Sequence, residues 1–459
     1  MVPNFRTLVF LACVWPLAAQ LPPDMAAKVD TAAEKALADS GAPSLSLAVV
    51  KDGRIAYVKA YGKARLEPAT AARPEMRYSI GSVSKQFMAA AILMLVEEGK
   101  LSLDDPVGRY LPNLTRANEV TIRQLLSHTS GYQDYYPLDY VAPWMTKPVT
   151  ADDILQRWAS KALDFDPGTR WQYSNTNFVA AGRILERVTG QPLSVFMRAR
   201  IFGPLEMTSV IDLDEKQMTD TDAEGYTRFG LGPSRPAPPE GRGWLFAAGE
   251  LAMTAQDLAK WDMSLIDHKL LKPGSIDSMM NPVRLKNGAP TGYGLGVGIA
   301  DANGHPRMSH GGAVSGFVSL NTVWPDERAA VVVFANTDGS NAPGSVTNQV
   351  APLLLAEAED PGAAHALEQA KRIFSGLQEG RIDRGLLDAD ANSYFTGQVL
   401  KDAAASLGPL GAPESFRQTS VELRGGMTYR HFRIEYKGKS LHLSTFTAVD
   451  GKLAQYLIQ

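Results

Sequence analysis

An apolar run from Met88 to Val96 lies shortly after Ser82 and Lys85, and this stretch constrains the fold more than any other. The run is apolar almost all round, which predicts a helix buried on every side rather than an amphipathic surface helix. Ser82 and Lys85 are three residues apart, so on a helix their side chains share one face, about one turn apart. The sequence therefore predicts a buried helix that starts with a serine and a lysine side by side.

This pair of side chains favours nucleophilic chemistry. Burial disfavours an ammonium ion and lowers the pKa of Lys85, which makes the lysine a base for Ser82. Free backbone N–H groups and the helix dipole at a helix N-terminus stabilise a developing negative charge. The alternative is a serine N-cap followed by a lysine that reaches solvent. Ser-x-x-Lys alone leaves both interpretations open, and the other motifs have to decide between them.

The N-terminus predicts export. Arg6 precedes an apolar stretch, Thr7–Ala19, and the small residues at its end are typical of a secretory signal peptide over residues 1–20. A membrane-tethered N-terminus is the alternative, so we expect a secreted or periplasmic protein with membrane association left open.

Cys13 is the only cysteine and the histidines are scattered, so we expect no disulfide, no metal and no cofactor. A net charge of −3 gives no reason to expect nucleic acid as a partner.

The order of the predicted elements indicates two domains in the 459 residues. Strand-like stretches at 44–50, 55–60, 293–299, 316–324 and 329–335 enclose a helical middle. This order favours an α/β (α+β) domain whose antiparallel sheet joins its N- and C-terminal segments beside a helical region. Residues 131–148 lack periodicity and are rich in Tyr, Pro and Asp, which is typical of a functional loop. After the signal peptide we expect a catalytic domain over 24–357, a linker over 358–367 and a small α+β domain over 368–459.

Two further short motifs follow Ser82-x-x-Lys85 in order, Tyr173-Ser174-Asn175 and His310-Gly311-Gly312. With these motifs, residues 25–357 resemble the serine β-lactamase and penicillin-binding protein superfamily, specifically its class C β-lactamase-like branch. Each motif is weak alone, whereas three in order at suitable separations form a strong pattern. The resemblance implies a β-lactamase-like fold. The C-terminal segment resembles appended cystatin-like or nuclear-transport-factor-like domains.

The resemblance also implies catalytic roles. Ser82 would be the nucleophile, and Lys85 and Tyr173 would share the task of removing its proton. A cationic Lys85 would lower the pKa of Tyr173 towards that of a usable base. The backbone N–H groups of Ser82 and Ala313 would form the oxyanion hole.

Substrate-binding roles follow from the same motifs. Asn175 would bind a substrate carbonyl or the Lys85 ammonium. His310, Gly311 and Gly312 would line the site, with the glycines letting the strand approach the substrate closely. β-Lactam-binding relatives carry Lys-Thr where this chain has His310-Gly311, and a histidine near neutral pH is only partly charged. We therefore expect weak binding of substrate carboxylates.

These observations predict a secreted serine hydrolase that forms an acyl-enzyme at Ser82 with ester or amide (peptide-like) substrates. Esterase or D-amino-acid peptidase activity is expected. The alternatives are a β-lactamase or penicillin-binding DD-peptidase, and a catalytically silent protein that binds peptidoglycan. The expected partner is a small-molecule or peptide-like substrate, with peptidoglycan and the oligomeric state left open.

Overall fold

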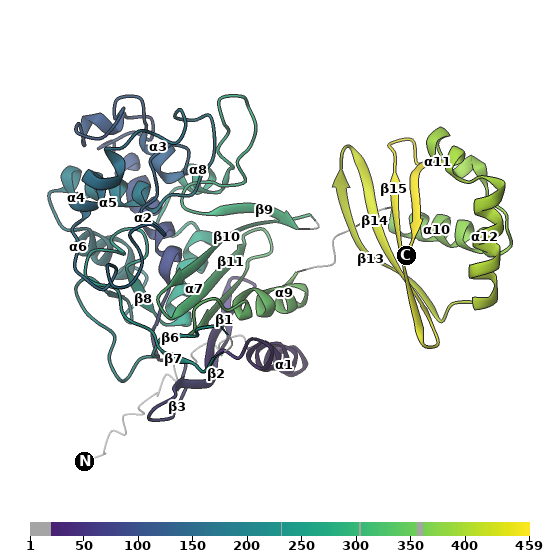
Figure 1. Cartoon of the computed structure of the whole chain (residues 1–459), viewed down its shortest axis with the longest axis horizontal. Coiled ribbons are helices and arrows are strands. Elements are labelled where there is room, and N and C mark those ends of the chain that lie inside the picture. Colours follow the sequence, from purple (N-terminus) through teal and green to yellow (C-terminus); the bar gives the residue numbers. More distant parts are fainter. Residues whose placement is uncertain (1–19, 231, 303, 356–359, 361) are drawn as a thin grey trace, which may run out of the picture. The chain divides into compact units, whose positions relative to one another are not determined.

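The computed structural model describes residues 20–230, 232–302, 304–355, 360 and 362–459. The described residues form two compact units, a larger one of residues 20–300 and 306–355 and a smaller one that contains residues 360 and 362–459 together with the hairpin tip around 301–305 (Figure 1). All but the last residue of the predicted signal peptide, 1–20, lies outside the described residues. Among the described helices, none combines the length and the apolar character needed to cross a membrane.

A seven-stranded sheet forms the centre of the larger unit, in the order β3-β2-β1-β12-β11-β10-β9. The strands are β1 (Ser44–Lys51), β2 (Arg54–Arg65), β3 (Thr70–Ala71), β9 (Gly298–Ala302), β10 (His305–Val314), β11 (Phe317–Trp324) and β12 (Ala329–Ala335). β1 pairs antiparallel with β12, with Leu45 opposite Ala335. This pairing confirms the expected antiparallel sheet that joins the N- and C-terminal segments of the domain.

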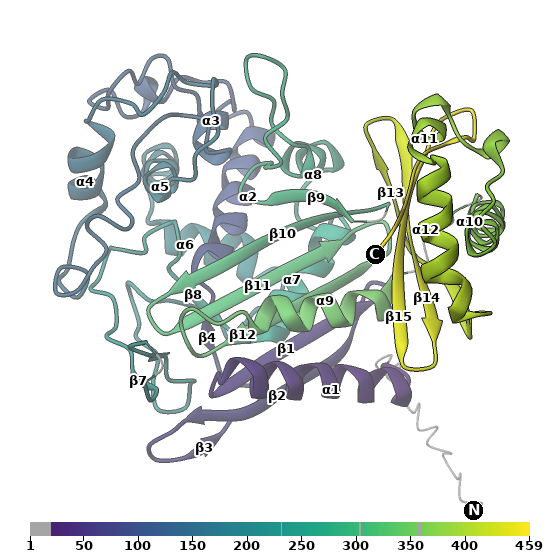
Figure 2. The same ribbon diagram turned by 45° about the vertical axis from the view of Figure 1, so that its right-hand side comes forward.

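Both faces of the central strands are covered. In β1, Leu45 and Leu47 pack into one core, whereas Ala48 and Val50 belong to the larger core on the opposite face. Such strands have continuous apolar runs because alternate side chains enter different cores. Helices α1 (Pro23–Ser40) and α9 (Ala342–Leu354) lie side by side on the first face (Figure 2), and α7 (Ala255–Ile266) packs against the sheet as well.

The helical region contains α2 (Ser84–Glu97), and every residue from Ser84 to Leu95 is buried. The ring of Phe87 in α2 lies 4.6 Å from the ring of Trp261 in α7, measured between centroids. This burial confirms the predicted apolar helix. The remaining helices here are α3 (Ile122–Leu126), α4 (Ala151–Ile154), α5 (Asn175–Thr189), α6 (Leu193–Met197) and α8 (Pro273–Met280). Five short strands complete the unit: β4 (Tyr78–Ser79), β5 (Ile211–Asp212), β6 (Tyr226–Thr227), β7 (Arg235–Pro236) and β8 (Leu251–Met253).

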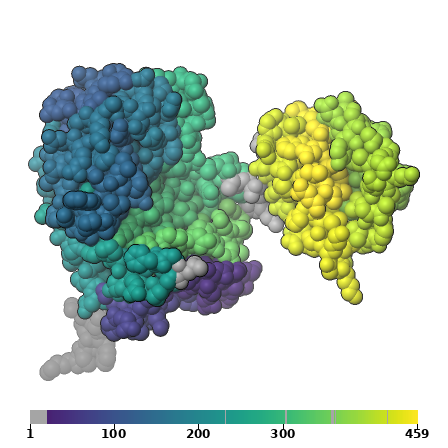
Figure 3. Space-filling view, viewed as in Figure 1, coloured from purple at the N-terminus to yellow at the C-terminus, as the bar shows by residue number. Residues whose placement is uncertain are grey.

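The smaller unit packs a four-stranded antiparallel sheet against helices around its own core (Figure 1). In the space-filling view, the atoms of its strands are yellow and those of its helices are green (Figure 3). Its elements are α10 (Ala363–Gln378), α11 (Ala389–Tyr394), α12 (Gly397–Leu407), β13 (Ser415–Arg424), β14 (Met427–Tyr436), β15 (Lys439–Thr447) and β16 (Leu453–Ile458). Helix α10 begins inside the segment expected to be a linker, 358–367. Asp360 anchors the start of the unit through a buried ion pair, with 2.8 Å between its carboxylate and the Arg430 guanidinium.

Candidate active site

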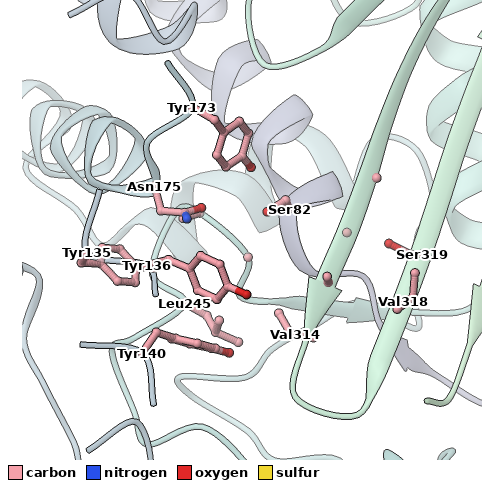
Figure 4. A pocket seen from close by; sticks show the side chains of 15 residues that line it. Ser82, Tyr135, Tyr136, Tyr140, Tyr173, Asn175, Leu245, Val314, Val318 and Ser319 are labelled. Atoms are coloured by element: carbon pink, nitrogen blue, oxygen red, sulfur yellow. The ribbon is translucent and has the colours of Figure 1, made fainter. Parts of the chain in front are cut away.

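A cleft of about 380 Å³ opens in the larger unit, with Ser82 among the residues that line it (Figure 4). One wall comes from the loop 131–148, which contributes Tyr135, Tyr136 and Tyr140. The facing wall is the end of β10, from Gly311 to Val314. None of the described side chains that line the cleft is charged. The cleft therefore suits an uncharged, partly apolar group, and the loop is part of the site as its composition predicts.

Ser82 lies in a 3₁₀ turn, Gly81–Val83, that leads directly into α2. The turn is pressed against the sheet, because a Cβ atom on Gly312 would come within 1.9 Å of the carbonyl oxygen of Ile80. The Ser319 hydroxyl donates a hydrogen bond of 2.7 Å to the same carbonyl. Only glycine fits at position 312, because any side chain there would collide with the Ile80 carbonyl. The glycine thereby allows the turn that carries Ser82 to pack directly against β10 and β11.

Lys85 is fully buried one helical turn after Ser82. Its Nζ atom lies 2.9 Å from Ser82 Oγ, 2.8 Å from Asn175 Oδ1 and 2.6 Å from the carbonyl oxygen of Ala248. The two carbonyl-type oxygens can only accept, so a neutral amine donates its two protons to them and points its lone pair at Ser82. Burial lowers the pKa of Lys85 to about 7, and the nearby Asp134 and Glu250 partly oppose this. The geometry and the pKa both suit a base that accepts the Ser82 proton.

The Tyr173 ring lies 5.1 Å from Lys85 Nζ, measured to the ring centroid, and its hydroxyl points toward Ser82 (Figure 4). That hydroxyl is buried and meets no described hydrogen-bond partner with good geometry. Burial raises the pKa of Tyr173, although the Ser82 hydroxyl offsets part of the rise. The expectation that Lys85 lowers the pKa of Tyr173 is wrong, because loss of hydration dominates at this position. Tyr173 keeps its proton at neutral pH and suits the role of an acid.

Asn175 begins α5, lines the cleft and contacts Lys85. Its Nδ2 atom lies 3.2 Å from the nearer oxygen of Asp134, and its backbone N–H donates to Asp134 Oδ1 at 2.9 Å. Of the two contacts expected for Asn175, the structure contains the one with Lys85. Asp134, in the loop 131–148, was not predicted as a site residue, although the Tyr- and Asp-rich composition of that loop indicated a functional role.

Ala313 lies on β10 beside the nucleophile turn. It lines the cleft, and a Cβ atom on Gly81 would come within 3.0 Å of the Ala313 nitrogen. Gly81 has φ +50°, a left-handed conformation that favours glycine. The structure therefore brings Ser82 and Ala313 to one end of the cleft, as the predicted oxyanion hole requires, and Gly81 leaves room for that approach.

His310 does not line the cleft. His310 is buried with its ring 6.1 Å from the Tyr173 ring, measured between centroids, whereas its neighbour Gly311 lines the cleft. Nδ1 of His310 donates to the carbonyl oxygen of Gly311 at 2.6 Å, and Nε2 accepts from the Tyr293 hydroxyl at 2.8 Å. Burial and the nearby Lys85 lower the pKa of His310 to about 3. The expectation of a partly charged histidine at neutral pH is wrong.

A metal site was not expected from the sequence. Within the part of the chain that the structure describes, no group of three or more His, Cys, Asp or Glu side chains is arranged to hold a metal ion. The polar groups that converge on the cleft are a serine, a lysine, a tyrosine and an asparagine. They suit acyl transfer through a serine nucleophile.

Comparison with known proteins agrees with this chemistry. Residues 29–356 match the family described as Beta-lactamase. The chain is 29% identical over 309 residues to the "Putative penicillin-binding protein PbpX" of Bacillus subtilis, covering 67% of this chain and 74% of that protein. It is 30% identical over 304 residues to a D-aminopeptidase of Brucella ovis, covering 65% of this chain and 57% of that protein. A solved D-stereospecific amidohydrolase from Streptomyces sp. superposes with a TM-score of 0.62 and 28% identity, covering 72% of this chain and 99% of that chain.

Proposed function

The chain belongs to the beta-lactamase family and is a serine hydrolase of the acyl-transfer kind, and on that premise we propose that Ser82 forms an acyl-enzyme with ester or amide substrates. The observation that carries the proposal is the 2.9 Å contact between Ser82 Oγ and the buried Lys85 Nζ. In the alternative interpretation, a serine N-cap followed by a snorkelling lysine, the ammonium group would reach solvent, whereas Lys85 is fully buried.

In the proposed acylation, Ser82 gives its proton to neutral Lys85 and its oxygen attacks the substrate carbonyl carbon. The N–H groups of Ser82 and Ala313 stabilise the oxyanion. When the bond to the leaving group breaks, Tyr173 donates a proton to that alcohol or amine. Transfer of a proton from Lys85 to Tyr173 then restores both groups. Water repeats these steps on the acyl-enzyme and releases the acid and free Ser82.

We propose esterase or D-amino-acid peptidase activity for this site. The similarity to a D-aminopeptidase and to a D-stereospecific amidohydrolase supports amide substrates. The uncharged cleft supports neutral ones, because a substrate carboxylate would lose its hydration there without meeting a cation. β-Lactamase or DD-peptidase activity is the second candidate, favoured by the similarity to the PbpX protein.

A substrate panel tests the proposal. Initial rates with p-nitrophenyl butyrate, a series of D- and L-amino-acid amides and nitrocefin should show ester or D-amide hydrolysis above nitrocefin hydrolysis. Ser82→Ala should abolish every activity in the panel. Activity that survives in Ser82→Ala would overturn the assignment, and a catalytically silent protein would give no rate with any substrate.

Export is part of the proposal. The signal-peptide pattern over residues 1–20 supports a secreted or periplasmic protein, for which peptidoglycan fragments are a candidate substrate source. N-terminal sequencing of the protein recovered from cells tests this. A chain that begins near residue 20 supports export, and an intact Met1 would contradict cleavage.

A further inference from the structure

Asp134 connects the cleft wall with the catalytic groups. Its Oδ1 atom accepts hydrogen bonds from the backbone N–H of Tyr136 at 3.2 Å and from the backbone N–H of Asn175 at 2.9 Å. The Nδ2 group of Asn175 donates to the same carboxylate. One half-buried side chain therefore ties the loop that supplies Tyr136 to the first residue of α5.

The carboxylate decides which way the Asn175 amide faces. An ionised carboxylate only accepts hydrogen bonds, so the nitrogen end of the amide faces Asp134 and the oxygen end faces Lys85. The reversed amide would set two donors, Nδ2 and Lys85 Nζ, against each other. Asp134 thus maintains the acceptor that holds Lys85 Nζ in place beside Ser82.

Asp134 also supplies charge at a place where other groups are neutral. Around Lys85, burial lowers the pKa values of His128 and His310 and raises that of Tyr173, so these three groups are uncharged near neutral pH. Burial and the neighbouring Asp212 raise the pKa of Glu250 well above its usual range. Burial raises the pKa of Asp134 as well, and three N–H donors and Lys85 oppose that rise.

We propose that Asp134 is a positioning residue of the active site, whose carboxylate orients the Asn175 amide toward Lys85 and places a negative charge that acts on this lysine. The inference rests on the proposed roles of Ser82 and Lys85. Asp134 acts through Asn175 and Lys85 rather than by touching the substrate. It also links the Tyr136 wall of the cleft to the base, so movement of that wall changes the support of Lys85.

Asp134→Asn tests the charge, because the amide oxygen still accepts from Asn175. Removing the negative charge lowers the pKa of Lys85, so the basic amine persists to lower pH. The acidic limb of the pH–rate profile for labelling by a fluorophosphonate should move to lower pH by about one unit. Asp134→Ala removes the acceptor too, and its plateau rate should fall by about tenfold or more below that of Asp134→Asn.

Asp139→Asn is the matched control in the same loop. The Asp139 carboxylate accepts from Arg157 and Trp158, away from Lys85, so this variant should leave the limb in place. If the acidic limb of the pH–rate profile stays in place or moves to higher pH in Asp134→Asn, the inference is overturned. An equal shift of this limb in Asp139→Asn would overturn it as well. If Asp134→Asn does not fold, the same shift of the acidic limb can be measured in Asp134→Ser, which has a smaller neutral side chain.

Labelling of Ser82→Ala distinguishes failure of the proposed function from failure of the proposed role of Asp134. If Ser82→Ala is labelled as fast as the unchanged protein, the proposed function fails. If labelling requires Ser82 but the limb does not respond to Asp134→Asn, only the role of Asp134 fails.

Discussion

The side-chain nitrogen of Lys85 lies 2.9 Å from the hydroxyl oxygen of Ser82, and the lysine is fully buried. Burial lowers the pKa of this amine to about 7, so a large share of the molecules hold it as a neutral base at physiological pH. The same amine donates to Ala248 and Asn175, which leaves its lone pair for Ser82. Nucleophile and base are preorganised before any substrate binds.

The protonation state of Lys85 should determine the pH below which activity falls. The neutral amine exists above its pKa, so kcat/KM for an uncharged ester should be high above pH 7 and fall as the pH drops through about 7. Lys85→Arg keeps a cation that cannot lose its proton, and should cost about two to four orders of magnitude. The measurement is kcat/KM for p-nitrophenyl butyrate across pH. A profile that is flat through neutrality would contradict this role.

Tyr173 should matter more for amides than for activated esters. An amine leaves only after it gains a proton, whereas p-nitrophenolate leaves without one. Tyr173→Phe should therefore reduce amide hydrolysis by about two to four orders of magnitude and p-nitrophenyl ester hydrolysis by about tenfold or less. Steady-state rates of the variant on both substrates check this difference. Equal losses on both substrates would show that Tyr173 does not act as the acid.

Gly81→Ala should damage the oxyanion hole. The new Cβ atom would lie 3.0 Å from the Ala313 nitrogen, which would displace that N–H from Ser82, and kcat should fall by about a hundredfold. Gly99→Ala is the matched control, because Gly99 has φ +69° and nothing within 4 Å of its Cβ position. Both variants should lose about 1–2 kcal/mol of stability from backbone strain. Thermal unfolding and kcat, measured together, separate strain from catalysis, and an equal loss of kcat in both variants would refute the argument.

Charge at position 311 should change substrate preference. Gly311 faces the cleft, and the nearest atom to an added Cβ is the Ser319 carbonyl oxygen at 3.8 Å, so a side chain fits. Gly311→Lys should raise the kcat/KM ratio of nitrocefin to p-nitrophenyl butyrate by about tenfold, because its ammonium can pair with the nitrocefin carboxylate. Gly311→Gln, of similar size without charge, should leave the ratio unchanged. A similar rise in both variants would show that charge is not the cause.

Local spacing was enough to predict the catalytic core. Ser82 and Lys85 are neighbours because one helical turn separates them, and the apolar run after them requires burial, which in turn lowers the pKa of Lys85. The antiparallel sheet was predictable as well, because strand-like runs lie at both ends of the domain. Both predictions rest on short-range periodicity.

The errors come from contacts between distant segments. The third motif lies within β10, where His310 is buried against Tyr173 and Gly311 lines the cleft. A low pKa for His310 follows from that burial, which local sequence does not reveal. Asp134 was missed for a similar reason, since its partner Asn175 lies 41 residues away across an aperiodic loop.

Acylation of Ser82 can be observed by mass spectrometry of the trapped enzyme. The protein should be incubated with a fluorophosphonate, or quenched in acid during turnover of a slow ester, and then digested. We predict the added mass on the peptide that contains Ser82, and its absence from Ser82→Ala, with a slower appearance at pH values below about 7. An adduct on any other residue, in a Ser82→Ala variant that still turns over substrate, would show that Ser82 is not the nucleophile.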